Sequence, residues 1–99
     1  SIEKPLDVFV ATLGDEADKI GFQILMKLRQ EGVNSEKDFL GRSLKAQMKH
    51  AGRFNARIAL IIGETELSRG VAVLRWMDTS EQSEVSLNNV VKAVKEKLF

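Results

Sequence analysis

Apolar stretches of strand length alternate along the chain with stretches in which apolar residues recur every three or four positions. Residues 7–13, 57–63 and 70–77 are largely β-branched or apolar, so each is predicted to be a strand. Residues 57–63 are continuously apolar, which is typical of a central strand covered on both faces. Residues 33–39 and 82–86 are more polar and are predicted to be short strands, the first at the edge of the sheet.

Three helices are predicted between and after these strands. The first begins with acids at Asp15, Glu16 and Asp18, where the helix dipole favours them, and Gly32 is its expected left-handed cap. The second spans about 43–54, with Ser43 as N-cap and apolar positions at Leu44, Met48 and Ala51. The third begins at Ser86 and has one apolar side, formed by Leu87, Val90, Val91, Val94 and Leu98. Residues 64–69 are predicted to be a polar loop.

The order of these elements predicts a three-layer α/β/α domain with a mixed five-stranded sheet and three helices. The first three strands are joined by helical crossovers and must be parallel, while the short turn at residues 78–81 makes strands four and five an antiparallel hairpin. Residues 1–6 are interpreted as a ragged N-terminal segment and residues 7–99 as one domain. Ligands of such sheets bind beyond the carboxyl ends of the parallel strands.

Charge is distributed unevenly along a chain whose net charge is only +1. Residues 39–63 contain no Asp or Glu, although they contain Arg42, Lys45, Lys49, Arg53 and Arg57. Such a basic segment can bind a polyanion locally, because the field near a patch depends on nearby charges. Cysteine is absent, which excludes disulfides and thiolate sites. We see no signal peptide and no apolar run long enough to span a membrane, so we expect a cytoplasmic protein without a membrane partner.

The sequence from residue 38 onward carries a resemblance to a known family. Residues 38–49 (DFLGRSLKAQMK) are similar to the D-x-x-G-R-S-L-K-x-Q stretch of histidyl-tRNA synthetases. Ala56-Arg57, then Gly63-Glu64-x-Glu66-Leu67, Gly70 and the stretch ending at Arg75 follow in the family's order. The match covers roughly residues 6–98. The chain therefore resembles the C-terminal anticodon-binding domain of class IIa aminoacyl-tRNA synthetases of the histidyl type, which implies a five-stranded mixed sheet with three helices.

The resemblance implies that the chain binds the anticodon loop of histidine tRNA and leaves the chemistry to a catalytic domain of a parent chain. That parent would be a histidine–tRNA ligase that forms a homodimer. Its catalytic domain would be a partner of this domain and would use ATP and Mg²⁺. None of these cofactors is expected to bind this domain. Two alternatives stay open: a synthetase-like domain reused for dimerisation or regulation, and the anticodon-binding domain of a threonyl-, prolyl- or glycyl-tRNA synthetase. A nucleotide-binding enzyme of flavodoxin-like topology is remote, because the glycines form no phosphate loop.

Eight residues are candidates for RNA contact. Lys45, Lys49 and Arg53 share one stripe of the second helix and are expected to contact the RNA backbone, although solvated basic faces are also common. Gly41, Arg42 and Ser43 lie at the start of that helix, where free N–H groups attract a phosphate or base acceptor. By the resemblance, Glu66 and Arg75 read anticodon bases; otherwise they are a loop acid and an exposed strand Arg.

The sequence shows no catalytic or metal-binding group of residues. His50 is the only histidine and is interpreted as packed or solvated rather than as a ligand or base. Trp76 could stack on a base, but its strand spacing favours packing under a helix. No nucleophile–base pair and no catalytic pair of carboxylates can be assigned.

Overall fold

The structure is a computed structural model that describes residues 4–99, and its five strands form one mixed sheet. The strand order is β2-β1-β3-β4-β5. The bounds are β1 (Val8–Thr12), β2 (Ser35–Lys37), β3 (Ile58–Ile62), β4 (Val71–Trp76) and β5 (Gln82–Ser86). β1 pairs in parallel with β2 and β3, whereas β4 and β5 continue the sheet antiparallel. The predicted sheet, with three parallel strands followed by a hairpin, is confirmed.

The strand register brings the carboxyl ends of the three parallel strands to one edge of the sheet. Val10 pairs with Lys37 on one side and with Leu60 on the other, and Thr12 pairs with Ile62. The segments that leave these strands therefore begin close together. The segment after β2 contains the predicted Gly41-Arg42-Ser43 turn, so this turn lies at the carboxyl edge of the sheet.

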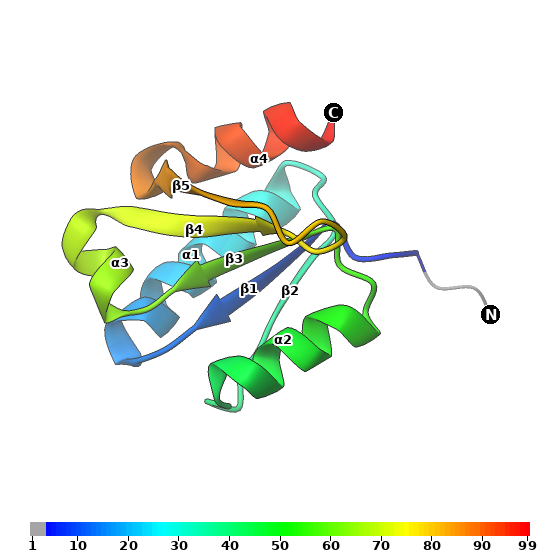
Figure 1. Cartoon of the computed structure of the whole chain (residues 1–99). Helices are drawn as coiled ribbons and strands as arrows, with labels where there is room; N and C mark the ends of the chain where they lie inside the picture. The colour runs from blue at the N-terminus through cyan, green and yellow to red at the C-terminus, as the bar shows by residue number, and fades with distance from the viewer. Residues whose placement is uncertain (1–3) are drawn as a thin grey trace.

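Helices cover both faces of the sheet, which gives three layers (Figure 1). The helices are α1 (Asp15–Gln30), α2 (Leu44–Arg53), α3 (Glu64–Arg69) and α4 (Val90–Leu98), with a short 3-10 turn, η1 (Leu87–Asn89), before α4. α1 and α4 pack on one face, where their apolar sides meet Val8, Val10 and Leu60. α2 packs on the other face, where Ala51 joins a smaller cluster with Phe9 and Ala11.

Two of the local signals that predicted helix ends agree with the structure, whereas Ser86, predicted to begin the last helix, caps the 3-10 turn η1, and α4 itself begins at Val90. Ser43 Oγ accepts a hydrogen bond from Ala46 N at 3.2 Å, as an N-cap does. Gly32 adopts φ +81°, the left-handed conformation expected after α1. Gly21 has a packing reason to be glycine, since a Cβ there would lie 2.5 Å from Thr12 Cγ2. α1 therefore approaches β1 closely, near the carboxyl edge.

The prediction of a polar loop at residues 64–69 is wrong, because these residues form α3. Residues 4–99 therefore contain four α-helices rather than the three predicted. Gly63 is the N-cap, and its N–H donates to Glu66 Oε1 at 2.8 Å. Gly70, with φ +68°, ends the helix. A helix of six residues is too short to show an apolar period, so the pattern alone predicted a loop.

β2 is shorter than predicted, since only Ser35–Lys37 pair with β1 rather than residues 33–39. Its position at the edge of the sheet is confirmed. Of the predicted ragged segment, residues 1–3 lie outside the described residues. Leu6 is buried, and its backbone bonds to Phe54 O and Arg57 N.

Candidate nucleic-acid interface

The loop that leads into α2 is fixed by the buried carboxylate of Asp38. Asp38 lies just after β2, and its Oδ2 accepts a hydrogen bond from Arg42 N at 3.0 Å. Its Oδ1 lies 3.7 Å from Arg42 Nη1. Gly41 adopts φ +66°, which lets the chain turn between these two residues. The structure therefore holds Gly41, Arg42 and Ser43 together at the start of α2.

The guanidinium of Arg42 is oriented by two side chains. Besides the Asp38 carboxylate, His50 Nδ1 lies within hydrogen-bonding distance of Arg42 Nη1. Because a guanidinium only donates, this contact requires His50 Nδ1 to act as the acceptor. The His50 ring stacks on Phe54, with centroids 5.1 Å apart and an angle of 2° between planes. The Arg42 side chain remains 36% exposed, so part of its fork of five donors still faces solvent.

Gln47 fastens α2 to the end of β1, a role that the apolar pattern did not single out. Its side chain is fully buried, and its Oε1 accepts from Thr12 N at 3.0 Å. Its Nε2 donates to Thr12 O at 2.9 Å and to Arg42 O at 2.8 Å. Of the three α2 positions predicted to form its apolar side, Ala51 is buried, but Leu44 and Met48 are only half-buried. A polar residue therefore sets the position of this helix.

A buried lysine organises the same edge of the sheet. The Lys37 side chain is only 3% exposed, and its Nζ donates to Thr12 Oγ1 and to Asp38 O, both at 2.9 Å. It also pairs with Asp18 Oδ1 at 3.2 Å. The hydroxyl of Thr12, which donates to Asp18, and the Lys37 ammonium hold the pKa of Asp18 below its usual value. β1, β2 and α1 are thereby joined beside Asp38.

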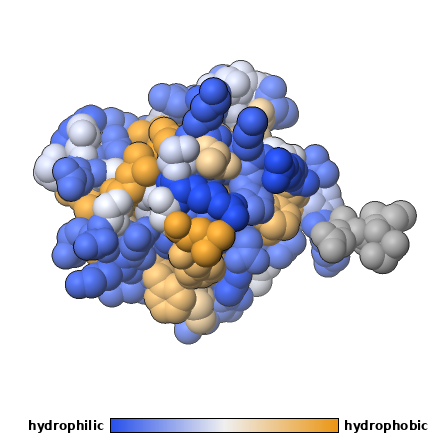
Figure 2. Space-filling model, turned by 90° about the horizontal axis from the view of Figure 1, so that it is seen from below, coloured by the Kyte–Doolittle hydropathy of each residue, from blue (hydrophilic) through white to orange (hydrophobic). Residues whose placement is uncertain are grey.

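The predicted basic stripe is exposed along α2. Lys45, Lys49 and Arg53 are all exposed, as is Arg57 just beyond the helix. Within residues 4–99 no carboxylate lies within 4 Å of these four cations. Figure 2 looks at the face that carries α2, and hydrophilic side chains cover much of it around an exposed apolar cluster. The structure therefore leaves the stripe free to meet an anion.

The face of the sheet beside α2 is open over β4 and β5. Phe9, Ala59, Arg75 and Gln82 form one cross-strand row, so their side chains share the face that α2 partly covers. Ala59 is buried, Arg75 is half-buried and Gln82 is exposed, so this face of the sheet becomes more exposed with distance from α2. Arg75 Nη1 donates to Gln82 Oε1 at 3.5 Å. Arg75 therefore presents its guanidinium on an uncovered part of the sheet.

The structure does not bring Glu66 and Arg75 together. Glu66 belongs to α3, and one of its carboxylate oxygens caps that helix at Gly63. Arg75 pairs with Ala59, four residues before Gly63, and four strand residues span about 13 Å. The two candidate reading residues therefore lie near different ends of β3, too far apart to hold one base.

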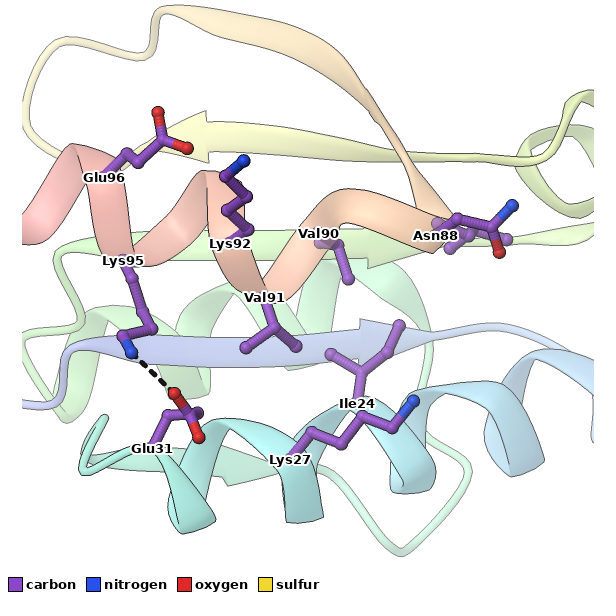
Figure 3. A pocket seen from close by; sticks show the side chains of 10 residues that line it. Ile24, Lys27, Glu31, Asn88, Val90, Val91, Lys92, Lys95 and Glu96 are labelled. Atoms are coloured by element: carbon purple, nitrogen blue, oxygen red, sulfur yellow. Dashed lines mark hydrogen bonds and ion pairs between the residues drawn. The ribbon is translucent and has the colours of Figure 1, made fainter.

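One cavity lies away from the candidate residues. It has a volume of about 940 Å³ and lies between α1 and α4, on the face of the sheet opposite α2 (Figure 3). Lys95 of α4 reaches across to Glu31 at the end of α1, with 2.5 Å between Nζ and Oε1. Two acids, Glu31 and Glu96, thus lie among the lysines of this cavity, whereas the stripe on α2 contains none.

Comparison of the chain with known proteins shows which family it belongs to. Residues 7–97 match the family model described as "Anticodon binding domain". The histidine–tRNA ligase of Desulfatibacillum aliphaticivorans is 53% identical over 90 residues, which cover 91% of this chain and 22% of that protein. That of Desulforamulus reducens is 50% identical over 88 residues, covering 89% and 21%. The chain therefore spans about a fifth of the length of these relatives.

Solved structures agree with these matches. The apo histidyl-tRNA synthetase of S. aureus superposes with a TM-score of 0.88 at 36% identity, covering 94% of this chain and 24% of that one. The RNA-binding domain of threonyl-tRNA synthetase from Cryptosporidium parvum superposes with a TM-score of 0.81 at 17% identity, which shows a shared fold. None of the helices described in residues 4–99 has the length and apolarity needed to cross a membrane.

Proposed function

Since the chain belongs to the family of anticodon-binding domains, we propose that it binds the anticodon loop of histidine tRNA. The choice of histidine tRNA rests on relatives that are 42–53% identical and are named histidine–tRNA ligases. In this role the chain grips and reads the anticodon, while a separate catalytic domain charges the acceptor end of the same tRNA.

The observation that carries the proposal is the row of unpaired cations on α2. Solvated protein surfaces normally mix charges of both signs. Arg29, Arg69 and Lys95 are examples in this chain of basic residues that pair with a glutamate. Lys45, Lys49 and Arg53 have no such partner within residues 4–99. Cations left without acids along one helix face fit the phosphates of an RNA strand.

Base reading is assigned to the open face of the sheet and its carboxyl edge. Arg42 is held in a fixed orientation by Asp38 and His50, so little side-chain entropy is lost when it binds a base or phosphate. Arg75 presents donors on the open face, and Glu66 offers a carboxylate about 13 Å away along the strands. Anticodon bases that are splayed over this face could meet each of these groups in turn.

The parent protein follows from the same proposal. The remaining four fifths of such a chain would contain the catalytic domain, which would use ATP and Mg²⁺ to join histidine to its tRNA, and the parent would be a cytoplasmic homodimer. Within residues 4–99 no group of three or more His, Asp or Glu side chains could hold a metal ion.

The test is a set of affinities for RNA stem-loops at one fixed salt concentration. The histidine anticodon has guanine at two of its three positions, so the panel contains the cognate loop and loops in which either guanine is replaced by adenine. We expect each replacement to weaken binding by about 1–3 kcal/mol. Equal affinities for all loops would favour a domain reused for dimerisation or regulation. If loops with threonine, proline or glycine anticodons are added and one of them binds more tightly than the histidine loop, the chain is the anticodon-binding domain of that other synthetase.

A further inference from the structure

The open face of the sheet carries another carboxylate, which lies closer to Arg75 than Glu66 does. Val73 of β4 pairs with Glu84 of β5, and Arg75 lies two residues after Val73. Residues two apart in a strand share a face, so Arg75 and Glu84 are diagonal neighbours on the same face of the sheet. Val85, the next residue on β5, packs into the core on the opposite face. Diagonal neighbours lie about 7–8 Å apart, which is within reach of long side chains.

The Glu84 carboxylate is oriented through one of its two oxygens. Arg69 Nη2, at the end of α3, donates to Glu84 Oε1 at 2.5 Å. The backbone holds the end of α3 beside the end of β5, because Leu87 N donates to Gly70 O at 2.9 Å. The other oxygen of Glu84 accepts no hydrogen bond within residues 4–99, and the side chain is 42% exposed. Glu84 is therefore held in place and still has a free acceptor.

Arg75 and Glu84 do not pair with each other, although their charges are opposite. No ion pair within 4 Å joins them, and Arg75 bonds instead to Gln82 at 3.5 Å, a long hydrogen bond. The surface beside them is apolar, since Val73 and its cross-strand partner Ile61 are half-buried on this face. An arginine donor and a carboxylate acceptor thus stand apart over an apolar part of the sheet.

Guanine matches this pair of groups better than the other bases do. Its O6 and N7 atoms accept hydrogen bonds from a guanidinium, and its N1–H and N2–H₂ groups donate to a carboxylate. Adenine has an amino group in place of O6 and no N1–H, so it would present a donor to the arginine and an acceptor to the carboxylate. A phosphate alone would bind Arg75 but would be repelled by Glu84.

We propose that Glu84 and Arg75 together recognise one guanine of the anticodon, with the base lying on Val73 and with Arg69 orienting the carboxylate. This inference rests on the proposed function. Glu66 is too far from Arg75 to share a base with it, so the two guanines of the histidine anticodon would meet one carboxylate each. Arg69 and Arg75 outnumber Glu84 within this group, so the local charge still favours an RNA strand.

The test is a double-mutant cycle with anticodon stem-loops at one fixed salt concentration. The variants are Glu84→Gln, Arg75→Ala and both together, and the loops are the cognate one and the two in which a single guanine is replaced by adenine. We expect each single variant to reduce discrimination at the same guanine by about 5- to 100-fold, and to leave discrimination at the other guanine within about 2-fold. Because both residues contact one base, the second substitution should add little to the first.

Glu96→Gln is the matched control, because it makes the same chemical change at an exposed position of α4, on the opposite face of the sheet, and should alter no affinity. A Glu84→Gln variant that binds every loop more tightly by the same factor, or that discriminates as the wild type does, would overturn the inference. Losses of discrimination at different guanines for Glu84→Gln and Arg75→Ala would also overturn it. A wild-type chain that binds no loop, or that binds all loops equally, would instead contradict the proposed function itself.

Discussion

The two carboxylate oxygens of Glu66 have different surroundings, so one substitution can remove the charge and keep the helix cap. One oxygen accepts from Gly63 N and caps α3, which leaves the carboxylate's charge and second oxygen for a base. Glu66→Gln keeps an oxygen for Gly63 but removes the charge. We expect it to erode discrimination against a guanine-to-adenine change by about 1–3 kcal/mol, while binding of the altered loop stays level or improves. Stem-loop affinities of the wild type and the variant measure this difference.

The effect of substituting Arg75 on loop discrimination can be compared with that of substituting Glu66. Arg75→Ala should weaken the cognate loop more than the altered one, because it loses donors to guanine or to the adjacent phosphate. The two residues lie about 13 Å apart along the strands, so they must contact different nucleotides. The double variant should therefore be additive to within about 0.5 kcal/mol. Losses that are equal on every loop would show that both residues only hold the RNA backbone.

Asp18 makes stability depend on pH. Its pKa is lowered in the folded state by the Thr12 hydroxyl and the Lys37 ammonium, so the carboxylate stabilises the fold above its unfolded pKa of about 3.9. This contribution is lost as pH falls through the lower, folded pKa. Asp18→Asn should cost about 1 kcal/mol at pH 7, a small value because the side chain is 47% exposed. Urea unfolding at pH 7 and at pH 3 tests this: a difference between wild type and variant that does not shrink at pH 3 contradicts it.

At the scale of elements, α2 combines a fixed inner side with a free outer one. Gln47 bonds to both backbone groups of Thr12, and Ala51 packs with Phe9 and Ala11, so the helix cannot shift without breaking buried hydrogen bonds. Its outer stripe makes no ion pair within the described residues. Changing the stripe should therefore alter RNA binding and leave the fold nearly unaffected.

The triple variant Lys45→Ala, Lys49→Ala, Arg53→Ala should weaken binding of every stem-loop without changing which anticodon is preferred. Each phosphate contact releases counterions, so losing three should flatten the log–log dependence of affinity on salt by about 2–3 units. The matched control, Lys19→Ala, Lys92→Ala, Lys97→Ala, removes the same charge from exposed positions of α1 and α4. Equal effects of the two variants, or no effect of the first at low salt, would show that the stripe is only a solvated face.

At the scale of the whole molecule, the chain matches only the anticodon-binding part of its relatives, which are histidine–tRNA ligases. The cavity between α1 and α4 contains lysines and glutamates, with Lys95 paired to Glu31, and the described residues include no cluster of possible metal ligands. We therefore expect this isolated chain, given histidine, ATP and tRNA, to form no histidyl-adenylate. Pyrophosphate exchange measures this directly. Exchange above background would contradict the view that the chain only binds.

The sequence by itself was sufficient for the sheet and for most helix ends. The apolar run at residues 57–63 and the short turn after β4 specify local conformation and strand direction, and Ser43 and Gly32 mark helix ends through bonds to near neighbours. It did not reveal α3, because a six-residue helix stabilised by its caps has no apolar period.

The exposure of the basic stripe followed from sequence as well, because the 3.6-residue period places residues four apart on one side of a helix. The roles of Asp38, Gln47 and Lys37 did not, since each is polar and its burial depends on partners elsewhere in the chain. Thr12, for example, lies 35 residues before Gln47 and 25 before Lys37. Likewise, only the strand register separates Glu66 from Arg75 and places Arg57 beside Met77. Local patterns fix how each segment folds, whereas contacts between distant segments decide which polar groups meet.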